Sequence, residues 1–178
     1  MTGYKVKPRG VISYPIKDID GNVYRTIIIG TKVWMADNLK VTKYNDGTPI
    51  PNITDNALWA AQTIGAYCDY NNNPTNSITY GRLYNRYAVN TGKLAPKDWH
   101  VATQSEWSEE INNSFFPIYC GSRSDSYGTF SDLDNGLWWT STPSNGYFWY
   151  IQSNKYGTND NYNGYSKSGY SVLCVKDK

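Results

Sequence analysis

WHVATQSEW, residues 99–107, is the stretch of the sequence that decides the fold. Thr103 and Glu106 form a capping box: the Thr hydroxyl accepts a hydrogen bond from the backbone N–H of residue 106, and the Glu carboxylate reaches back to the Thr N–H. This motif predicts a helix over residues 103–114. Trp107 and Ile111 are four residues apart, so both are expected to face the core.

The sequence on either side of this helix predicts short strands and one more helix. Asp20-Gly21 is a hairpin signal. Residues 80–90 are expected to form a helix ending at Gly92, because their apolar side chains recur at helical spacing. Residues 57–62 could form a short helical turn after a long loop at 41–57. The predicted strands are rich in β-branched and aromatic residues and cover 23–29, 33–35, 138–140, 147–152 and 171–176.

These elements predict an α+β domain with two helices, several short antiparallel strands and a high loop content. Residues 1–17 read as a lead-in segment, and residues 18–178 as a single domain. Four tryptophans that stand beside predicted strands and the capped helix are expected in the core. They are Trp34, Trp107, Trp138 and Trp139.

Composition excludes several classes of protein. The 178 residues are 16% aromatic, which argues against disorder. The net charge is +2 and no Lys/Arg cluster is present, so nucleic acid is not an expected partner. No apolar run of about 18 residues exists, so no transmembrane segment is expected. The first residues lack the apolar region of a signal peptide. An extracellular protein would need a signal that this chain lacks, or another route such as assembly into a virion.

Residues 138–175 have the composition of a binding surface. Their apolar ends enclose a run of Asn, Tyr, Ser and Gly in which only Lys155, Asp160 and Lys167 are charged. Tyr gives a large amphipathic contact area at low entropic cost, and Ser, Gly and Asn give adaptable hydrogen bonds. The alternative is structural: Asn, Gly and Ser make turns, and Tyr fills a half-buried sheet.

Strand alternation assigns a direction to each side chain in this segment. Trp149 and Ile151 are expected in the core, with Tyr150, Gln152 and Asn154 facing a ligand. Residues 159–165 are expected to form a loop that crosses the surface. The predicted ligand-binding residues are Asn145, Tyr147, Tyr150, Gln152, Asn154, Tyr156, Asn159, Asp160, Asn161, Tyr162, Asn163 and Tyr165.

Catalytic, metal and redox signals are weak. His100 is the only histidine, and a structural hydrogen bond suits it better than general-base catalysis. Residues 18–22 (DIDGN) suit a hairpin turn better than an EF-hand, whose glycine and glutamate spacing they lack. A structural cation site could still use Asp125, Asp132, Asp134 and Asn135. Cys68, Cys120 and Cys174 allow three pairings and leave one thiol over. No cofactor, metal site or catalytic site is predicted.

WHVATQSEW resembles the W-x-(L/V)-P-T-x-x-E-W signature of formylglycine-generating-enzyme-like C-type lectin folds, and more closely the Fibrobacter succinogenes major paralogous domain. The resemblance covers about residues 18–177. Ala102, Ala95 and Leu173 stand where that family usually has Pro, Cys and Arg. Without a cysteine at 95, the resemblance leaves Cys120 as a substitute bridge partner. The other stretches that agree with the domain are residues 18–46, 65–72, 80–94, 138–142 and 169–177.

The resemblance implies a C-type lectin fold in which the N- and C-terminal strands pair, the helices pack on the sheet, and a later loop-rich region presents the ligand surface. The same fold class serves the variable proteins of diversity-generating retroelements, and residues 144–166 look like such a diversified segment. Family members could also be rich in Asn and Tyr there without diversification. The cysteine pair of the copper enzyme and the calcium motifs of lectins are absent from this sequence.

The expected function is therefore non-enzymatic ligand binding, in receptor binding or adhesion, on a virion or cell surface. The expected partner is a macromolecule, protein or glycan, on a target cell, and oligomerisation is compatible with the sequence. Two alternatives remain: a calcium-independent carbohydrate-binding module, and a structural surface or pilus-tip domain without a specific ligand.

Overall fold

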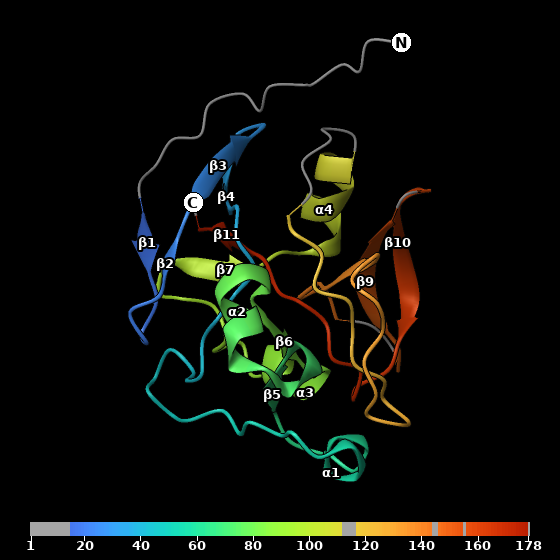
Figure 1. The fold of residues 1–178 in the computed structure, drawn as a ribbon. Helices are drawn as coiled ribbons and strands as arrows, with labels where there is room; N and C mark the ends of the chain where they lie inside the picture. Colours follow the sequence, from blue (N-terminus) through green and yellow to red (C-terminus); the bar gives the residue numbers. More distant parts are fainter. Residues whose placement is uncertain (1–14, 112–116, 144–145, 155, 178) are drawn as a thin grey trace.

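The computed structural model describes residues 15–111, 117–143, 146–154 and 156–177, and the side chains of residues 109–111 and 161–163 lie outside that description. Within these residues the chain forms helices and small antiparallel sheets, so the α+β prediction is confirmed (Figure 1). The helices are α1 (Asn56–Ala60), η1 (Tyr70–Asn72), α2 (Pro74–Tyr80), α3 (Arg86–Asn90) and α4 (Gln104–Ile111). None of them is an apolar helix of membrane-spanning length.

One sheet joins the two ends of the domain. Its order is β3-β4-β11-β7, and Trp34 on β4 pairs with Val175 on β11. The expected pairing between N- and C-terminal strands is therefore present, and β3 and β4 themselves form an antiparallel hairpin. The strand bounds are β3 Thr26–Ile29, β4 Lys32–Met35, β7 Trp99–Val101 and β11 Cys174–Lys176.

A small hairpin precedes this sheet, as Asp20-Gly21 predicts. Strands β1 (Ile16–Lys17) and β2 (Val23–Tyr24) pair, and the Asp18 carboxylate fixes the turn between them. Asp18 Oδ1 accepts hydrogen bonds from the N–H groups of Asp20 and Asn22, both at 2.9 Å. Asp18 Oδ2 accepts from the Tyr24 hydroxyl at 2.5 Å. Residues 18–22 therefore form the hairpin turn, held by N–H and O–H donors.

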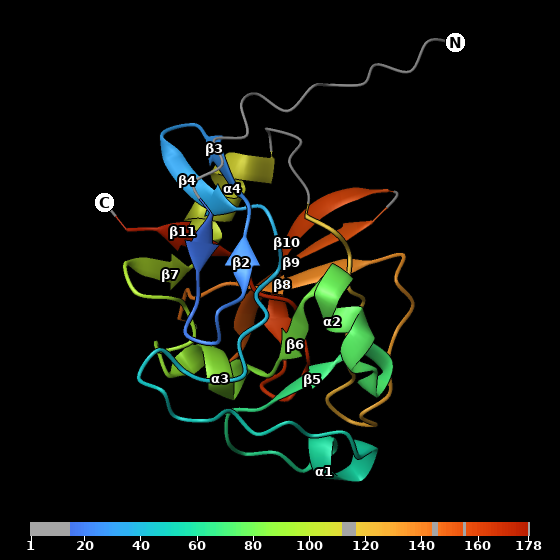
Figure 2. The same cartoon turned by 60° about the vertical axis from the view of Figure 1, so that its left-hand side comes forward.

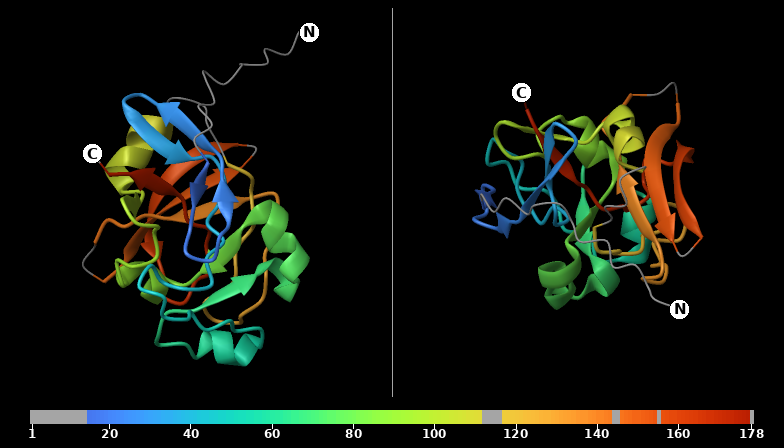
Figure 3. Two further views of the ribbon diagram at one scale, coloured as in Figure 1. Left: turned by 90° about the vertical axis from the view of Figure 1, so that its left-hand side faces the viewer. Right: turned by 90° about the horizontal axis from the view of Figure 1, so that it is seen from above.

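A second sheet lies on the other side of the molecule from β1 and β2 (Figures 1 and 3). Its order is β10-β9-β8, with β8 at Gly136–Trp139, β9 at Phe148–Asn154 and β10 at Gly157–Gly164. The prediction of a loop at 159–165 is wrong for residues 159–164, which belong to β10. The sequence of β10 lacks apolar alternation, and its strand conformation comes from backbone pairing with β9.

Helix α4 packs between the two sheets and begins at the predicted capping box. The Thr103 hydroxyl accepts from Glu106 N–H at 3.2 Å, and the Glu106 carboxylate accepts from Thr103 N–H at 2.9 Å. The Trp107 ring meets Trp34 of β4 edge-on at 5.2 Å and lies 5.6 Å from Trp138 of β8. These aromatic contacts join both sheets through one helix. The four predicted core tryptophans are buried; the Ile111 side chain lies outside the described part.

The single helix predicted over residues 80–90 is wrong. Helix α2 ends at Tyr80, strand β6 occupies Arg82–Tyr84, and α3 begins at Arg86. Gly81 adopts φ +78°, which side-chain-bearing residues rarely adopt, and so breaks the helix. Asn85 then caps α3, its side-chain oxygen accepting from Ala88 N–H at 3.0 Å.

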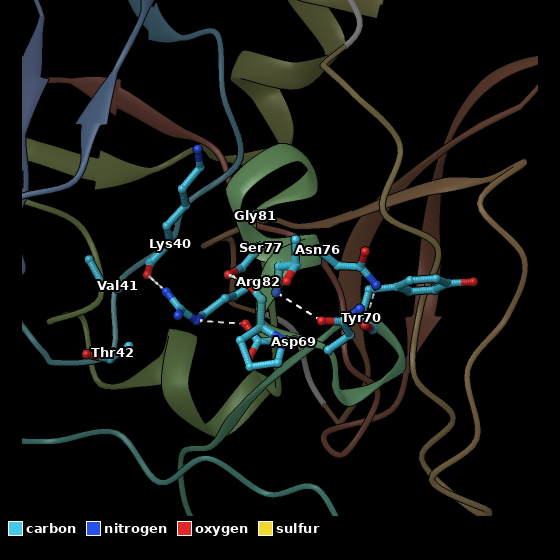
Figure 4. A network of polar contacts seen from close by, with 12 residues as sticks. Lys40, Val41, Thr42, Asp69, Tyr70, Asn76, Ser77, Gly81 and Arg82 are labelled. Carbon is cyan, nitrogen blue, oxygen red and sulfur yellow. Dashed lines mark hydrogen bonds and ion pairs between the residues drawn. The ribbon is translucent and has the colours of Figure 1, made fainter.

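Strand β6 pairs with β5 (Tyr67–Asp69), and a polar network ties this pair to the preceding loop (Figure 4). Arg82 Nε lies 3.1 Å from Asp69 Oδ1, and the Arg82 guanidinium donates to the Lys40 carbonyl. Asn76 donates to the Tyr70 carbonyl at 2.9 Å. Figure 2 shows α2 beside β5 and β6, with α1 at the far end of the molecule from the β3–β4 hairpin.

All three cysteines are buried and free, so the disulfide that the resemblance implies is absent. Cys68 and Cys120 belong to a small cluster with Trp59, whereas Cys174 lies in the main core. Burial raises the pKa of the Cys68 thiol to about 12 and that of Cys120 to about 12. Burial also raises the pKa of Cys174. At neutral pH these thiols are protonated and behave as small apolar side chains.

Candidate ligand-binding surface

The predicted binding residues lie mainly on the β9–β10 hairpin and its two ends. Residues opposite each other in an antiparallel pair point to the same side of the sheet, and successive residues alternate. Gln152 pairs with Asn159 on β10 and with Leu137 on β8. Asp160 pairs with Ile151, which faces the other way. The register therefore divides the predicted site between two faces.

Helix α4 covers one of these faces. Ile151 and Ser153 are buried on it, and Trp138 of β8 packs against Trp107 of α4. Asp160 lies on the same side, because its carboxylate accepts a hydrogen bond from the Gln104 amide of α4 at 2.6 Å. Asp160 thus faces away from Gln152 and Asn159.

The opposite face, called here the outer face, carries Tyr150, Gln152, Asn154 and Asn159. Of these, Asn159 is exposed and the other three are half-buried. Tyr150 is partly structural: its ring lies 5.0 Å from Tyr170 and 6.3 Å from Trp139. Burial raises the pKa of the Tyr150 hydroxyl. Tyr150 therefore supports the outer face as well as forming part of it.

Trp149 does not occupy the core as predicted. It shares a face with Ile151 but remains half-buried, outside the main cluster of buried residues. Its position next to the end of the strand explains this: β8 pairs with β9 only from Tyr150 to Ser153, so Trp149 lies beyond the last β8 partner.

Exposed tyrosines lie at both ends of the β9–β10 hairpin. At one end, the Tyr147 and Tyr165 rings meet edge-on at 6.2 Å, and they are 46% and 56% exposed. At the other, Tyr156 is 86% exposed in the turn between β9 and β10. Strand β9, from Phe148 to Asn154, is itself roughly 20 Å long. This length suits a macromolecular ligand better than a single small molecule.

A buried arginine underlies the Tyr147 end. Arg86 of α3 is 1% exposed, and its guanidinium stacks on Phe148 at 4.5 Å and near Trp139 at 5.7 Å. It donates hydrogen bonds to the Thr140 and Thr142 carbonyls. Burial lowers the pKa of Arg86 to about 10, so it remains cationic at neutral pH. It thereby ties α3 to the chain that leads from β8 into β9.

A pocket of about 560 Å³ adjoins the Tyr156 end. Its lining is Tyr119, Leu133, Asp134, Asn135, Asn154 and Tyr156. Only Asn154 and Tyr156 of these are predicted binding residues. A second pocket, of about 280 Å³, lies near β1 and contains none of them. The first pocket extends the predicted surface onto the loop before β8. From the sequence, Asp134 and Asn135 in that loop were expected only as candidates for a structural cation site.

Several sequence predictions concern groups that the structure leaves out or places elsewhere. Asn145 lies outside the described residues, as do the side chains of Asn161, Tyr162 and Asn163. Among the described residues, no three or more His, Cys, Asp or Glu side chains are grouped to hold a metal ion. The Asp125, Asp132, Asp134 and Asn135 set therefore does not form such a group.

His100 links three elements through carboxylates. Its Nδ1 lies 2.7 Å from Asp177 beyond β11, and its Nε2 lies 3.0 Å from Glu106 of α4. Partial burial opposes the imidazolium, but the hydrogen bonds to Asp177 and Glu106 outweigh it and raise the pKa of His100. Both ring nitrogens thus have carboxylate partners, and the geometry favours the predicted structural hydrogen bond.

Comparison with known protein families gives a match. The model of the Fibrobacter succinogenes major domain matches residues 27–115, half of the chain. The match includes the capping box and α4, and it ends before β8, β9 and β10. No curated protein and no solved structure matches the chain. The chain therefore belongs to the Fibrobacter succinogenes major domain family.

Proposed function

We propose that this protein is a non-enzymatic binding domain with a C-type lectin fold, and that it holds a macromolecular ligand on the outer face of the β9–β10 hairpin. The observation that carries the proposal is the outer face itself. It is a strip of Tyr, Asn and Gln side chains along strand β9, which is roughly 20 Å long, and the buried Trp139 and Tyr170 pack beside Tyr150 on the same face.

The physical chemistry of this strip resembles that of a paratope. Exposed tyrosines at both ends offer large, rigid contact areas, and the amides of Gln152, Asn154 and Asn159 offer hydrogen bonds of either polarity. Binding energy concentrates in a few aromatic anchors that lose water on contact. In this proposal Tyr147, Tyr165 and Tyr156 are the anchors, and the ligand is a protein or glycan displayed by a target cell.

The C-type lectin assignment has two supports. The chain belongs to a family whose signature resembles that of such folds, and strands from both ends of the domain pair in one sheet. The protein would then be displayed on a virion or cell surface. Residues 144–166 would be a segment diversified by a retroelement. A reverse-transcriptase gene beside a near-copy of the 3′ coding end would support that origin, and its absence would contradict it.

The experiment compares binding and folding in surface variants. We expect the fluorescently labelled protein to bind selectively to one cell type in a panel of bacterial and eukaryotic cells. The combined variant Tyr147→Ala, Gln152→Ala and Asn159→Ala should lose this binding and keep a near-native melting temperature. Tyr150 is left unchanged because it packs on Tyr170.

A matched control carries Ile19→Ala and Val23→Ala, which are 46% and 53% exposed and lie around β1 and β2. It should bind like the parent protein. Retained binding by the outer-face variant, with loss in the control, would move the site to the opposite side of the molecule. Unfolding of the outer-face variant would show that the strip is part of the core.

A further inference from the structure

We propose that the pocket beside Tyr156 is a subsite for a neutral sugar, so that the ligand of the outer face includes an uncharged saccharide unit. This inference rests on the proposed binding function and names the chemistry of one part of it. The pocket measures about 560 Å³, within the range of roughly 300–1,000 Å³ typical of small-molecule sites.

The floor of the pocket is apolar and held in place. The Tyr119 ring contacts the buried Trp138 edge-on at 6.0 Å, and its hydroxyl shares a hydrogen bond with Ser153 at 2.8 Å. Leu133 packs against the small buried cluster around Trp59. Both residues are thereby tied to the two cores of the domain. A floor fixed in this way loses little conformational entropy when a ligand settles on it.

The rim carries polar groups that are free to bind. Within the described residues, the side chains of Asp134 and Asn135 have no hydrogen-bond or ion-pair partner, and Asp134 is exposed. Asn154 uses its side-chain oxygen to accept from Tyr156 N–H at 2.9 Å, which leaves its amide N–H groups as donors. Carboxylate and amide groups on one rim match a ligand that presents several hydroxyls, each both donor and acceptor.

Besides the apolar floor and the polar rim, a sugar site needs an exposed aromatic ring, and Tyr156 supplies it. Its ring is 86% exposed beside the polar rim. The C–H face of a sugar ring is apolar, and its hydrogens are attracted to the negative face of an aromatic ring. A site with an aromatic face, a carboxylate and amides therefore fits a hydroxyl-rich ring better than a purely apolar ligand.

Charge decides which class of sugar fits. Asp134 is the one charged residue among the described lining residues. A carboxylate accepts hydrogen bonds from sugar hydroxyls, but it repels the carboxylate of a sialic or uronic acid. The pocket is therefore expected to select neutral saccharides over acidic ones.

The experiment uses an array of immobilised neutral and acidic oligosaccharides, followed by titration calorimetry with the best neutral one. We expect binding to neutral members. Asp134→Asn and Tyr156→Ala should each weaken it by at least about tenfold, since a hydrogen bond to a charged group contributes roughly that much. All variants should melt near the parent temperature, because both side chains are exposed.

Two matched controls share the same chemical changes. Asp132→Asn removes a charge from an exposed carboxylate two residues away and outside the pocket lining, and Tyr127→Ala removes a tyrosine that is 77% exposed. Both should bind the neutral oligosaccharide like the parent protein. Parent-like binding by Asp134→Asn and Tyr156→Ala would overturn the inference. So would a preference for acidic sugars, or binding to no member of the array.

The cell-binding experiment separates this inference from the broader proposal. If the outer-face variant loses cell binding while no saccharide binds the parent protein, the ligand is a protein and only the sugar subsite is wrong. If neither cells nor saccharides bind selectively, both proposals fail.

Discussion

Strands β8 and β10 flank the same strand, β9, and differ in almost every other respect. All four residues of β8 are buried, and they include Trp138 and Trp139. Strand β10 reads GTNDNYNG and forms the edge of the sheet, with Asn159 and Asp160 exposed. Both strands pair antiparallel with β9 through backbone hydrogen bonds. The difference shows that pairing alone can hold a strand in place while leaving its side chains open to change.

The two strands therefore have opposite tolerance for substitution. Trp138 is fixed by Trp107, Tyr119 and a hydrogen bond from its indole N–H to Asn38 at 2.8 Å. Trp139 contacts Tyr170 at 4.4 Å and donates to the Tyr84 carbonyl at 2.8 Å. Asn159 and Asp160 on β10 are exposed and have far less packing to lose. An arrangement of this kind suits a surface whose residues vary over a constant scaffold.

The largest expected effect on stability comes from a substitution on β8. Trp138→Ala should lower the free energy of unfolding by about 3–5 kcal/mol, because it leaves a cavity between α4 and the sheet and removes the donor to Asn38 Oδ1. Tyr156→Ala, at the β10 end, should change it by no more than about 0.5 kcal/mol. Denaturant unfolding of both variants checks the contrast, and equal effects would contradict it.

A middle effect is expected on β9. Tyr150→Ala should cost about 1–3 kcal/mol, because it removes aromatic contacts with Tyr170 and Trp139 as well as part of the buried surface. Tyr150→Phe keeps these ring contacts and should retain most of the stability. If Tyr150→Ala melts like the parent protein, the Tyr150 side chain does not contribute to the stability of the scaffold, and the residue belongs wholly to the outer face.

The helix behind the sheet gives a smaller effect. Thr103→Ala should cost about 1 kcal/mol, since it deletes the hydroxyl that accepts from Glu106 N–H at the start of α4. Thr103→Ser keeps the hydroxyl and should be close to neutral. A shift in the denaturant midpoint of both variants alike would mean that the Thr103 methyl group, rather than the cap, supports the helix.

The smallest effect is a pH dependence at His100. Its pKa is raised above 6.5, so its contribution to stability is fully present below pH 6.5 and is lost as pH rises through the folded-state pKa. Burial raises the pKa of Glu106, but hydrogen bonds from Thr103 and His100 outweigh it, so its contribution is lost as pH falls below 4.5. These two groups therefore contribute most between those values. His100→Asn should flatten the decline above pH 6.5 in denaturant midpoints; an unchanged decline would assign it to other groups.

Local signals in the sequence predicted the scaffold well. The capping box placed the start of α4, and Asp20-Gly21 placed the first hairpin. Four tryptophans, Trp34, Trp107, Trp138 and Trp139, were assigned to the core correctly, whereas Trp149 was not. Each of these features depends on contacts between near neighbours or on the general burial of large apolar side chains. Such features can therefore be predicted without knowledge of the tertiary structure.

Long-range contacts explain the errors. Residues 82–84 have helical periodicity, yet pairing with β5 and the backbone break at Gly81 make them a strand. Residues 157–164 have no apolar alternation, so only their pairing with β9 reveals a strand. For the same reason, sequence alternation separated Tyr150 from Ile151 correctly but did not show that Asp160 would turn towards Gln104. It also missed Tyr119 and Leu133, whose place in the pocket depends on tertiary packing.

The three buried thiols make the molecule convenient for labelling. Thiolates are the nucleophiles that react with maleimide reagents, and Cys68, Cys120 and Cys174 are both buried and held in the protonated form by their raised pKa values. A Tyr127→Cys substitution, at a position 77% exposed, would therefore introduce one reactive thiol into a background that needs no cysteine removed. A fluorophore attached there could report binding of a partner in solution, while the three native cysteines remain unlabelled.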